Sequence, residues 1–234
     1  MRAALYLIPV TLGNSPLERS LPTYNREIII GIKYFIVENI RSARRFLKQV
    51  DRDIDIDALT FFSLDKRTQP TELDNMLIPL GIGESVGILS EAGCPAVADP
   101  GSEVVSIAQR RGFTVIPLVG PSSIILSLMA AGFNGQNFAF NGYLPIAQDE
   151  RRKKLKMLEQ LINKENQTQI FIETPYRNTK MVEDIFLTCQ PQTRLCIAAN
   201  LTLESEFIRT KSVKEWRTHI PDLTGAICIF LLYK

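Results

Sequence analysis

A stretch of fifteen residues in the first half of the chain combines the residue types of a ligand-binding loop. Between Gly87 and Gly101 an apolar run passes into small residues, two prolines and two acids, with the sequence GILSEAGCPAVADPG. Loops at the carboxyl ends of strands are where open α/β sheets bind ligands. Gly93 permits a ligand to approach the backbone closely, and Pro95 and Pro100 restrict the loop. By composition alone, a plain strand-to-helix turn with helix-capping acids is an equal alternative.

A second loop, Gly120–Ser123 with the sequence GPSS, also joins an apolar run to a predicted helix. Its hydroxyls and the free amides of a helix N-terminus suit a carboxylate, such as that of the methionine part of S-adenosylmethionine. Taken by itself, Pro-Ser-Ser is more often an ordinary helix start.

Several common kinds of site are excluded by the sequence. The glycines from Gly81 to Gly87 precede a predicted strand, whereas a dinucleotide fingerprint follows one, and no GxxxxGK[ST] motif occurs. With His219 as the single histidine, a Ser-His-Asp or Cys-His hydrolase and a His-ligated metal are disfavoured, and we expect no metal. Four scattered cysteines indicate reduced thiols instead of a disulfide framework; they are Cys94, Cys189, Cys196 and Cys228.

The bulk composition is that of an ordinary globular protein. The chain has 234 residues, of which 45% are apolar and 22% charged, and its net charge of +2 neither requires nor excludes a nucleic-acid partner. No segment approaches the roughly 20 apolar residues that span a bilayer, so we expect a soluble, cytoplasmic protein with no membrane partner.

The elements that must position these loops alternate along the chain in the manner of an α/β protein. The predicted strands are Ala4–Val10, Lys33–Val37, Leu59–Leu64, Ser85–Leu89 and Phe113–Leu118, then Phe138–Asn141, Gln169–Ile172, Leu195–Ala199, Glu206–Thr210 and Ala226–Leu232. The predicted helices are Ile40–Val50, Ser102–Arg111, Ser122–Ala131 and a long helix capped by Asp149. We therefore expect two α/β domains, 1–118 and 119–234, each with a sheet of about five strands.

Four motifs in order, LSEAGCPAVADPG, VGPSS, FAFNGYLP and IFIETPYR, give the chain its resemblance to a known family. Together they resemble the ribosomal RNA small-subunit methyltransferase I family of the tetrapyrrole methylase superfamily. The resemblance runs from Leu5 to the closing strand at Thr224–Ala226 and implies two α/β domains, S-adenosylmethionine bound in a cleft between them, and a homodimer.

Carried over to matching positions, the resemblance implies a set of cofactor contacts. The first loop would contribute Gly93, Pro95 and Val97, and the second domain would contribute Ser122, Ser123, Thr174 and Ala226. The chain departs from the family at other positions. Glu38-Asn39-Ile40-Arg41 stands for Glu-Asp-Thr-Arg, Tyr176 for a histidine, and Ala199-Asn200-Leu201-Thr202 for Arg-Glu-Leu-Thr. These positions lie outside the cofactor loops, so they bear on the substrate.

Methyl transfer from a sulfonium to a ribose hydroxyl needs alignment and benefits from a general base. Glu91 is the catalytic candidate beside the cofactor loop, with Glu38 and Glu173 behind it. Arg41 and Arg177 are candidates for holding RNA phosphates. For each of these residues a salt-bridged or solvated surface position is the alternative.

Basic clusters at 41–48 and 151–154 are candidate phosphate tracks, although charge runs on helices are usually solvated faces. Three hypotheses follow: 2′-O-methylation of small-subunit ribosomal RNA, methylation of a small tetrapyrrole-type molecule, or a non-catalytic module that binds S-adenosylmethionine. Basic patches favour the first, an enclosed apolar site the second, and a blocked acceptor side the third.

Overall fold

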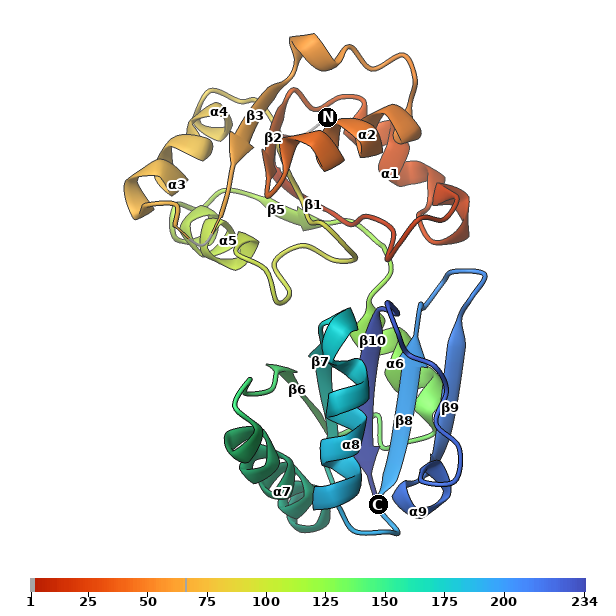
Figure 1. The fold of residues 1–234 in the computed structure, drawn as a ribbon. Helices are drawn as coiled ribbons and strands as arrows, with labels where there is room; N and C mark the ends of the chain where they lie inside the picture. The colour runs from red at the N-terminus through yellow and green to blue at the C-terminus, as the bar shows by residue number, and fades with distance from the viewer. Residues whose placement is uncertain (1–2, 66) are drawn as a thin grey trace. The chain divides into compact units, whose positions relative to one another are not determined.

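The computed structural model describes residues 3–65 and 67–234, which form two compact units that divide between Ser122 and Ser123 (Figure 1). The N-terminal unit ends at Ser122 and the C-terminal unit begins at Ser123. The border predicted from the sequence, after Leu118, lies a few residues earlier, at the end of the first sheet.

The N-terminal unit is built on a five-stranded parallel sheet in the order β3-β2-β4-β1-β5. Its strands are β1 (Leu5–Ile8), β2 (Tyr34–Val37), β3 (Thr60–Ser63), β4 (Val86–Leu89) and β5 (Val115–Pro117). The central strands are apolar along their whole length because helices cover both faces of the sheet.

Two separate cores show which helices cover which face of this sheet (Figure 1). Helices α1 (Thr23–Ile29) and α2 (Ile40–Val50) pack on one face, through Ile29 and Leu47 among others. Helices α3 (Pro70–Met76), α4 (Ile78–Gly81) and α5 (Gly101–Arg110) pack on the other, through Leu73 and Val104 among others. The connections after the neighbouring strands β1 and β4 therefore run to opposite faces, which defines a topological switch point at their carboxyl ends.

The C-terminal unit is built on a five-stranded mixed sheet in the order β6-β7-β10-β8-β9. Only the β6–β7 pair is parallel; the other neighbours are antiparallel. The strands are β6 (Phe138–Tyr143), β7 (Thr168–Glu173), β8 (Arg194–Ala199), β9 (Phe207–Ser212) and β10 (Cys228–Tyr233).

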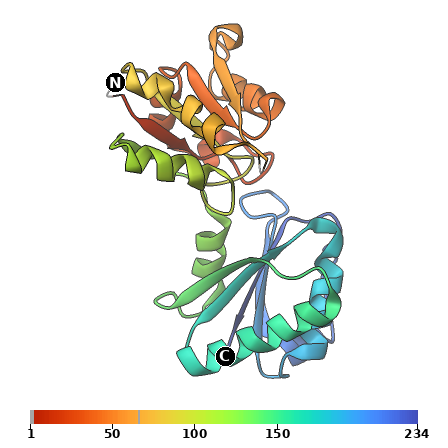
Figure 2. The ribbon, with the colours of Figure 1, turned by 90° about the vertical axis from the view of Figure 1, so that its left-hand side faces the viewer.

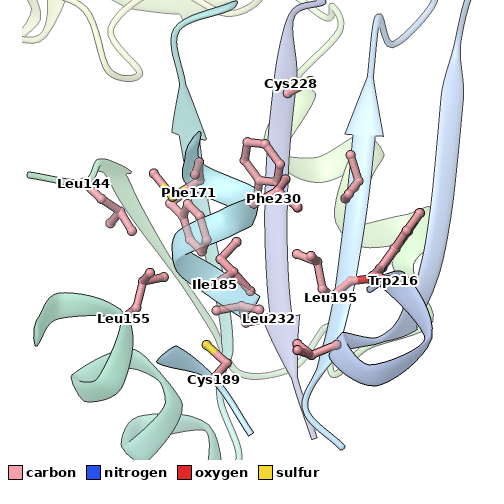
Figure 3. Packing of buried hydrophobic residues seen from close by; sticks show 14 of the residues in the cluster. Leu144, Leu155, Phe171, Ile185, Cys189, Leu195, Trp216, Cys228, Phe230 and Leu232 are labelled. Carbon is pink, nitrogen blue, oxygen red and sulfur yellow. The ribbon is translucent and has the colours of Figure 1, made fainter. Parts of the chain in front are cut away.

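The helices of the C-terminal unit lie on both faces of its sheet. Figures 1 and 2 show α6 (Ser123–Ala131) on the opposite face from α7 (Gln148–Glu165) and α8 (Asn178–Thr188). Under α7 and α8, the side chains of Leu155, Phe171 and Phe230 form the centre of the core (Figure 3). Short helix α9 (Val213–Trp216) adds Trp216, whose indole N–H donates to the Leu195 carbonyl at 2.8 Å.

The structure and the comparisons below confirm the predicted α/β class, and every strand predicted from the sequence is found. Helices α1, α3, α4, α8 and α9 were not predicted. The prediction that Asp149 caps the long helix is wrong, because α7 already begins at Gln148 after Ala147, and Asp149 lies inside its first turn. Within the described part of the chain, no helix is both long and apolar enough to cross a membrane.

Candidate functional site

The loop that follows β4 is folded tightly back onto the sheet at the switch point. The buried Ser90 hydroxyl donates to the Gly93 carbonyl at 2.8 Å, and the Val10 amide, just past β1, donates to the same carbonyl at 3.0 Å. Gly93 has φ +71°, in the left-handed region that favours glycine. At Gly93, the loop that follows β4 therefore turns back toward the carboxyl end of β1.

The Gly120–Pro121 turn after β5 lies against this loop. The Cys94 thiol donates to the Pro121 carbonyl at 3.3 Å, and a Cβ on Gly93 would lie 3.1 Å from that same oxygen. A Cβ on Gly120 would lie 2.2 Å from Cγ of Pro9, at the end of β1. The carboxyl ends of β4, β1 and β5, which are neighbours in the sheet, thus meet without room for an added methyl group.

The second half of the loop is held in a strained backbone by Asp99. Ala96 and Ala98 have φ of +64° and +61°, a region that costs a residue with a Cβ about 1–2 kcal/mol. Oδ1 of Asp99 accepts hydrogen bonds from the amides of Ala96 and Gly101, both at 2.8 Å. Burial raises the pKa of Asp99, and these two bonds oppose the rise. Val97 between the two alanines is 50% exposed, so the strained turn presents an apolar side chain to solvent.

A pocket of about 400 Å³ opens beside this loop at the carboxyl ends of β3 and β4. Ala96, Ala98 and Asp99 line one side, and Leu64 and Asp65 line another. It lies entirely in the N-terminal unit, at the edge where a parallel sheet binds ligands.

The two acids predicted in this unit are both exposed. The Ser42 hydroxyl, in the first turn of α2, donates to Oε1 of Glu91 at 2.6 Å. Glu38 directly follows the end of β2 and lies close to Asp99 and Pro100. The described structure therefore places both carboxylates at the edge of the loop, with Glu91 oriented by a hydroxyl.

Helix α2 carries the first basic cluster. The Asn39 side chain caps the helix by accepting from the amides of Arg41 and Ser42, at 2.9 and 3.2 Å. Arg41 is exposed, whereas the Arg44 guanidinium covers the Phe61 ring and the Lys48 ammonium donates to the Arg52 carbonyl.

In the C-terminal unit, Glu173 and Arg177 form an ion pair in the turn after β7. The Glu173 side chain is 1% exposed; its Oε1 accepts a hydrogen bond from Arg177 Nε at 2.9 Å and forms an ion pair with Nη2 at 2.7 Å. The same oxygen accepts from the amide and the hydroxyl of Thr174, at 2.7 and 3.1 Å. Both Thr174 and Arg177 are held in place by one buried carboxylate.

Ala226 lies beside this turn, two residues before the point where β10 pairs with the ends of β7 and β8. Cys228 pairs with both Glu173 and Ala199, so the residues just past these three strand ends share one edge. The buried Asn178 amide donates to the carbonyl of Ala226 at 2.8 Å. Asn200 fixes the same segment, because its side chain accepts from the Ile227 amide at 3.0 Å.

Half of the second basic cluster, Arg151 and Arg152, is engaged within the fold. Arg151 is 2% exposed and its Nε donates at 2.8 Å to Asp184, which is fully buried on α8. Arg152 Nε donates to the other oxygen of Asp184 at 2.8 Å. Burial alone would raise the pKa of Asp184, but hydrogen bonds from Arg151, Arg152 and Gln148 outweigh it and lower that pKa below its ordinary value. Of the predicted phosphate track, Arg151 is thus a structural residue, and Lys153 is exposed.

The thiols are unsuited to nucleophilic chemistry. Burial raises the pKa of Cys189, with a contribution from Glu159, and of Cys228 to about 12 each, and it raises that of Cys94 and Cys196 as well. Across 3–65 and 67–234, no three His, Cys, Asp or Glu side chains are placed together to hold a metal ion.

The structure brings the predicted residues together in two groups. In the N-terminal unit, Gly93 contacts the turn that leads to Ser122, and Glu91 lies at the start of the same loop. In the C-terminal unit, Thr174, Arg177 and Glu173 share one turn, with Ala226 beside it. The sequence did not single out the supporting roles of Asp99, Asn178 and Ser42. Only Asp99, two residues before Gly101, carried a local signal, as a capping acid.

A search of curated proteins found relatives over most of the chain, whereas no family model matches. A protein of Vibrio cholerae named ribosomal RNA small subunit methyltransferase I is 29% identical over 93% of this chain and 72% of its own length. A protein of the same name from Buchnera aphidicola subsp. Schizaphis graminum is 31% identical over 87% of this chain and 67% of its own length.

Two solved structures of similar fold are named as methyltransferases. The methyltransferase CobJ matches with a TM-score of 0.64 at 16% identity, covering 99% of this chain and 94% of that one. Uroporphyrin-III-C-methyltransferase from Thermus thermophilus matches with a TM-score of 0.56 at 18% identity, covering 100% and 93%.

The two α/β units, with a tightly folded loop at the switch point of the first, have the fold of the tetrapyrrole methylases. The extent and identity of the relatives are more specific: the chain belongs to the ribosomal RNA small subunit methyltransferase I family. Membership makes it a methyltransferase whose methyl donor is S-adenosylmethionine.

Proposed function

We propose that this protein transfers a methyl group from S-adenosylmethionine to a ribose 2′-hydroxyl of small-subunit ribosomal RNA. The contact between the Gly93–Cys94 turn and the Gly120–Pro121 turn carries the proposal, because it builds a ligand loop at the switch point of the N-terminal sheet. The RNA substrate rests on the names of the relatives.

The N-terminal loop suits the methyl donor, which supplies an electrophilic carbon when bound. An added Cβ on Gly93 would meet Leu12 at 3.0 Å and Pro121 at 3.1 Å, so glycine at this position lets the loop pack closely against the turn after β5. We assign Gly93, Pro95 and Val97 to the donor, with Ser122 beside them. Contacts from Ser123, Thr174 and Ala226 in the C-terminal unit stay a prediction from the family resemblance.

Glu91 is our candidate for accepting the proton of the ribose hydroxyl. A ribose hydroxyl is a weak acid, so a carboxylate at the reacting oxygen assists its attack on the methyl carbon. Ser42 orients Glu91 through Oε1, which leaves Oε2 as the oxygen that we assign to the proton. Glu38 is the second candidate at the same edge.

The remaining predicted residues take other roles in this proposal. Three hydrogen bonds and an ion pair converge on Oε1 of the buried Glu173, so we propose that it positions Thr174 and Arg177 instead of accepting a proton. Arg41, exposed beside the Ser42–Glu91 bond, suits an RNA phosphate. A cytoplasmic homodimer, expected from the family, is part of the proposal.

The experiment is transfer of tritiated methyl groups to small ribosomal subunits isolated from cells that lack this protein. We expect label in the ribosomal RNA at a linkage that resists alkaline hydrolysis, since that cleavage needs a free 2′-hydroxyl. Label at an alkali-sensitive position would overturn the 2′-O assignment.

A matched control uses Glu84→Gln, a surface acid of the same unit, beside Glu91→Gln. Donor binding by calorimetry without transfer to subunits would favour a non-catalytic module. Transfer to a tetrapyrrole but not to RNA would favour the small-molecule alternative.

A further inference from the structure

An exposed tyrosine stands at the edge of the C-terminal sheet in the turn between β7 and α8. Tyr176 is 81% exposed, an unusual position for a large aromatic ring. The guanidinium of Arg177 lies over its ring, 5.5 Å from the centroid. With one face of the ring covered by the guanidinium, the other face is open to solvent.

The support beneath this ring is rigid. Arg177 is fixed by a hydrogen bond and an ion pair to Glu173, whose side chain is 1% exposed at the end of β7. The three-residue turn Pro175–Arg177 connects directly to α8, whose first residue, Asn178, is fully buried and holds the Leu223 and Ala226 carbonyls. A flat ring is thus presented to solvent on a support that loses little entropy when a ligand stacks on it.

An exposed cationic side chain and a second exposed tyrosine occur on the elements that flank this turn. Lys180, in the first turn of α8, is exposed one helical turn beyond Tyr176. Tyr143, 59% exposed, ends β6 and pairs with Ile172 of the neighbouring strand. An exposed aromatic ring over a guanidinium, with an ammonium group one helical turn further along the chain, is an arrangement that can receive an unstacked base of single-stranded RNA.

From this geometry we infer that Tyr176 is a stacking platform for an unpaired nucleobase of the RNA substrate, with Arg177 as its positioning residue. The inference rests on the proposed function and deepens it by naming a substrate contact. In this role the Arg177 guanidinium supports the ring of Tyr176, while its charge is balanced by the Glu173 carboxylate.

The test is equilibrium binding of a fluorescein-labelled, single-stranded RNA oligonucleotide, followed by anisotropy. Loss of one stacked base corresponds to a Kd about 5- to 150-fold weaker, and we expect this range for Tyr176→Ala. Tyr176→Phe keeps the ring and should bind within about twofold of the wild type. Leu187→Ala, an exposed apolar residue at the far end of α8, is the matched control and should change nothing.

Calorimetry with S-adenosylmethionine separates the two sources of a nucleobase, RNA and the adenine of the donor. We expect Tyr176→Ala to leave donor affinity unchanged. Weaker donor binding with intact RNA binding would overturn the RNA assignment. Wild-type RNA affinity in Tyr176→Ala, with methyl transfer to subunits intact, would refute the platform and leave the proposed function standing. A wild-type protein that binds S-adenosylmethionine but neither binds nor methylates RNA would overturn the proposed function itself.

Discussion

Replacing Gly120 by alanine tests the close approach on which the donor site depends. The new Cβ would lie 2.2 and 2.3 Å from Cγ and Cβ of Pro9, both in a rigid ring. Ordinary contact begins at 3.4 Å, so the Gly120–Pro121 turn and the end of β1 must separate by about 1.2 Å. Overpacking of this kind costs about 1–3 kcal/mol of stability.

The same displacement should affect function more than stability. The Pro121 carbonyl would move away from the Cys94 thiol and from Gly93, which loosens the loop that we assign to the donor. A misplacement of about 1 Å can reduce an enzymatic rate by about 10²-fold. We expect a fall of that order in kcat/KM, and weaker donor binding by calorimetry.

The matched control is Gly81→Ala. Gly81 lies in the same unit, and an added Cβ there would have nothing within 4 Å. The free energy of unfolding of Gly81→Ala, measured in urea, should equal that of the wild type or exceed it by less than about 1 kcal/mol. If Gly120→Ala bound the donor and unfolded as the wild type does, the tight meeting of β1 and β5 would be refuted, and the proposed donor loop with it.

Three further changes test separate parts of the structure. Glu91→Gln should lower kcat for RNA methylation by about 10²- to 10⁴-fold with little effect on donor affinity. An unchanged rate constant of methyl transfer in single-turnover measurements would exclude Glu91 as the base. Ala98→Gly should raise the free energy of unfolding by about 0.5 kcal/mol, because it relieves an alanine in the left-handed region at some entropic cost. The control Ala130→Gly, inside α6, should lower that free energy by about 1 kcal/mol. Equal losses of the two variants in urea unfolding would contradict the backbone strain at Ala98. Asp184→Asn should lower the free energy of unfolding by about 3–5 kcal/mol because it leaves Arg151 buried without its charge partner.

Asp184 also predicts a pH dependence with a definite sign. Its pKa in the folded protein lies below the ordinary value of 3.8, so its contribution to stability is present above that value and is lost as the pH falls through the folded pKa. Wild-type protein should therefore lose more stability than Asp184→Asn on acidification below about pH 4, as measured by urea unfolding. Parallel losses in the two proteins would show that other carboxyl groups control the acid limb.

The strands could be predicted from the sequence because buried strands of an α/β sheet appear as short apolar runs between turn residues. Helix α3 was missed although a local signal existed: Gln69 and Glu72 form a capping box, with the Glu72 carboxylate accepting from the Gln69 amide at 2.8 Å. Its short amphipathic stretch, beside prolines at 70 and 79, was too weak to outweigh the turn residues around it.

In the candidate site, too, contacts between residues close in the sequence could be predicted, whereas contacts between distant residues could not. The Glu173–Arg177 pair spans four residues, so its spacing was visible in the sequence, but only burial decides that it is structural. The Arg151–Asp184 pair spans 33 residues and joins two helices, which no local pattern contains. A basic run was therefore interpreted as a phosphate track, although the fold engages half of it, Arg151 and Arg152.

The distribution of acids between the units narrows the choice of proton acceptor. In the C-terminal unit the buried carboxylates of Glu159, Glu173 and Asp184 all accept hydrogen bonds from side chains or amides that hold the fold together. A carboxylate used in this way cannot approach a ribose hydroxyl unless its turn or helix contact breaks first. Exposed acids beside the loop that we assign to the donor meet the requirement of reach; Glu91 lies on this loop, and Glu38 lies beside it at the end of β2. If Glu91→Gln and Glu38→Gln both kept the wild-type kcat, the hydroxyl would have to lose its proton to solvent, and alignment alone would account for the acceleration.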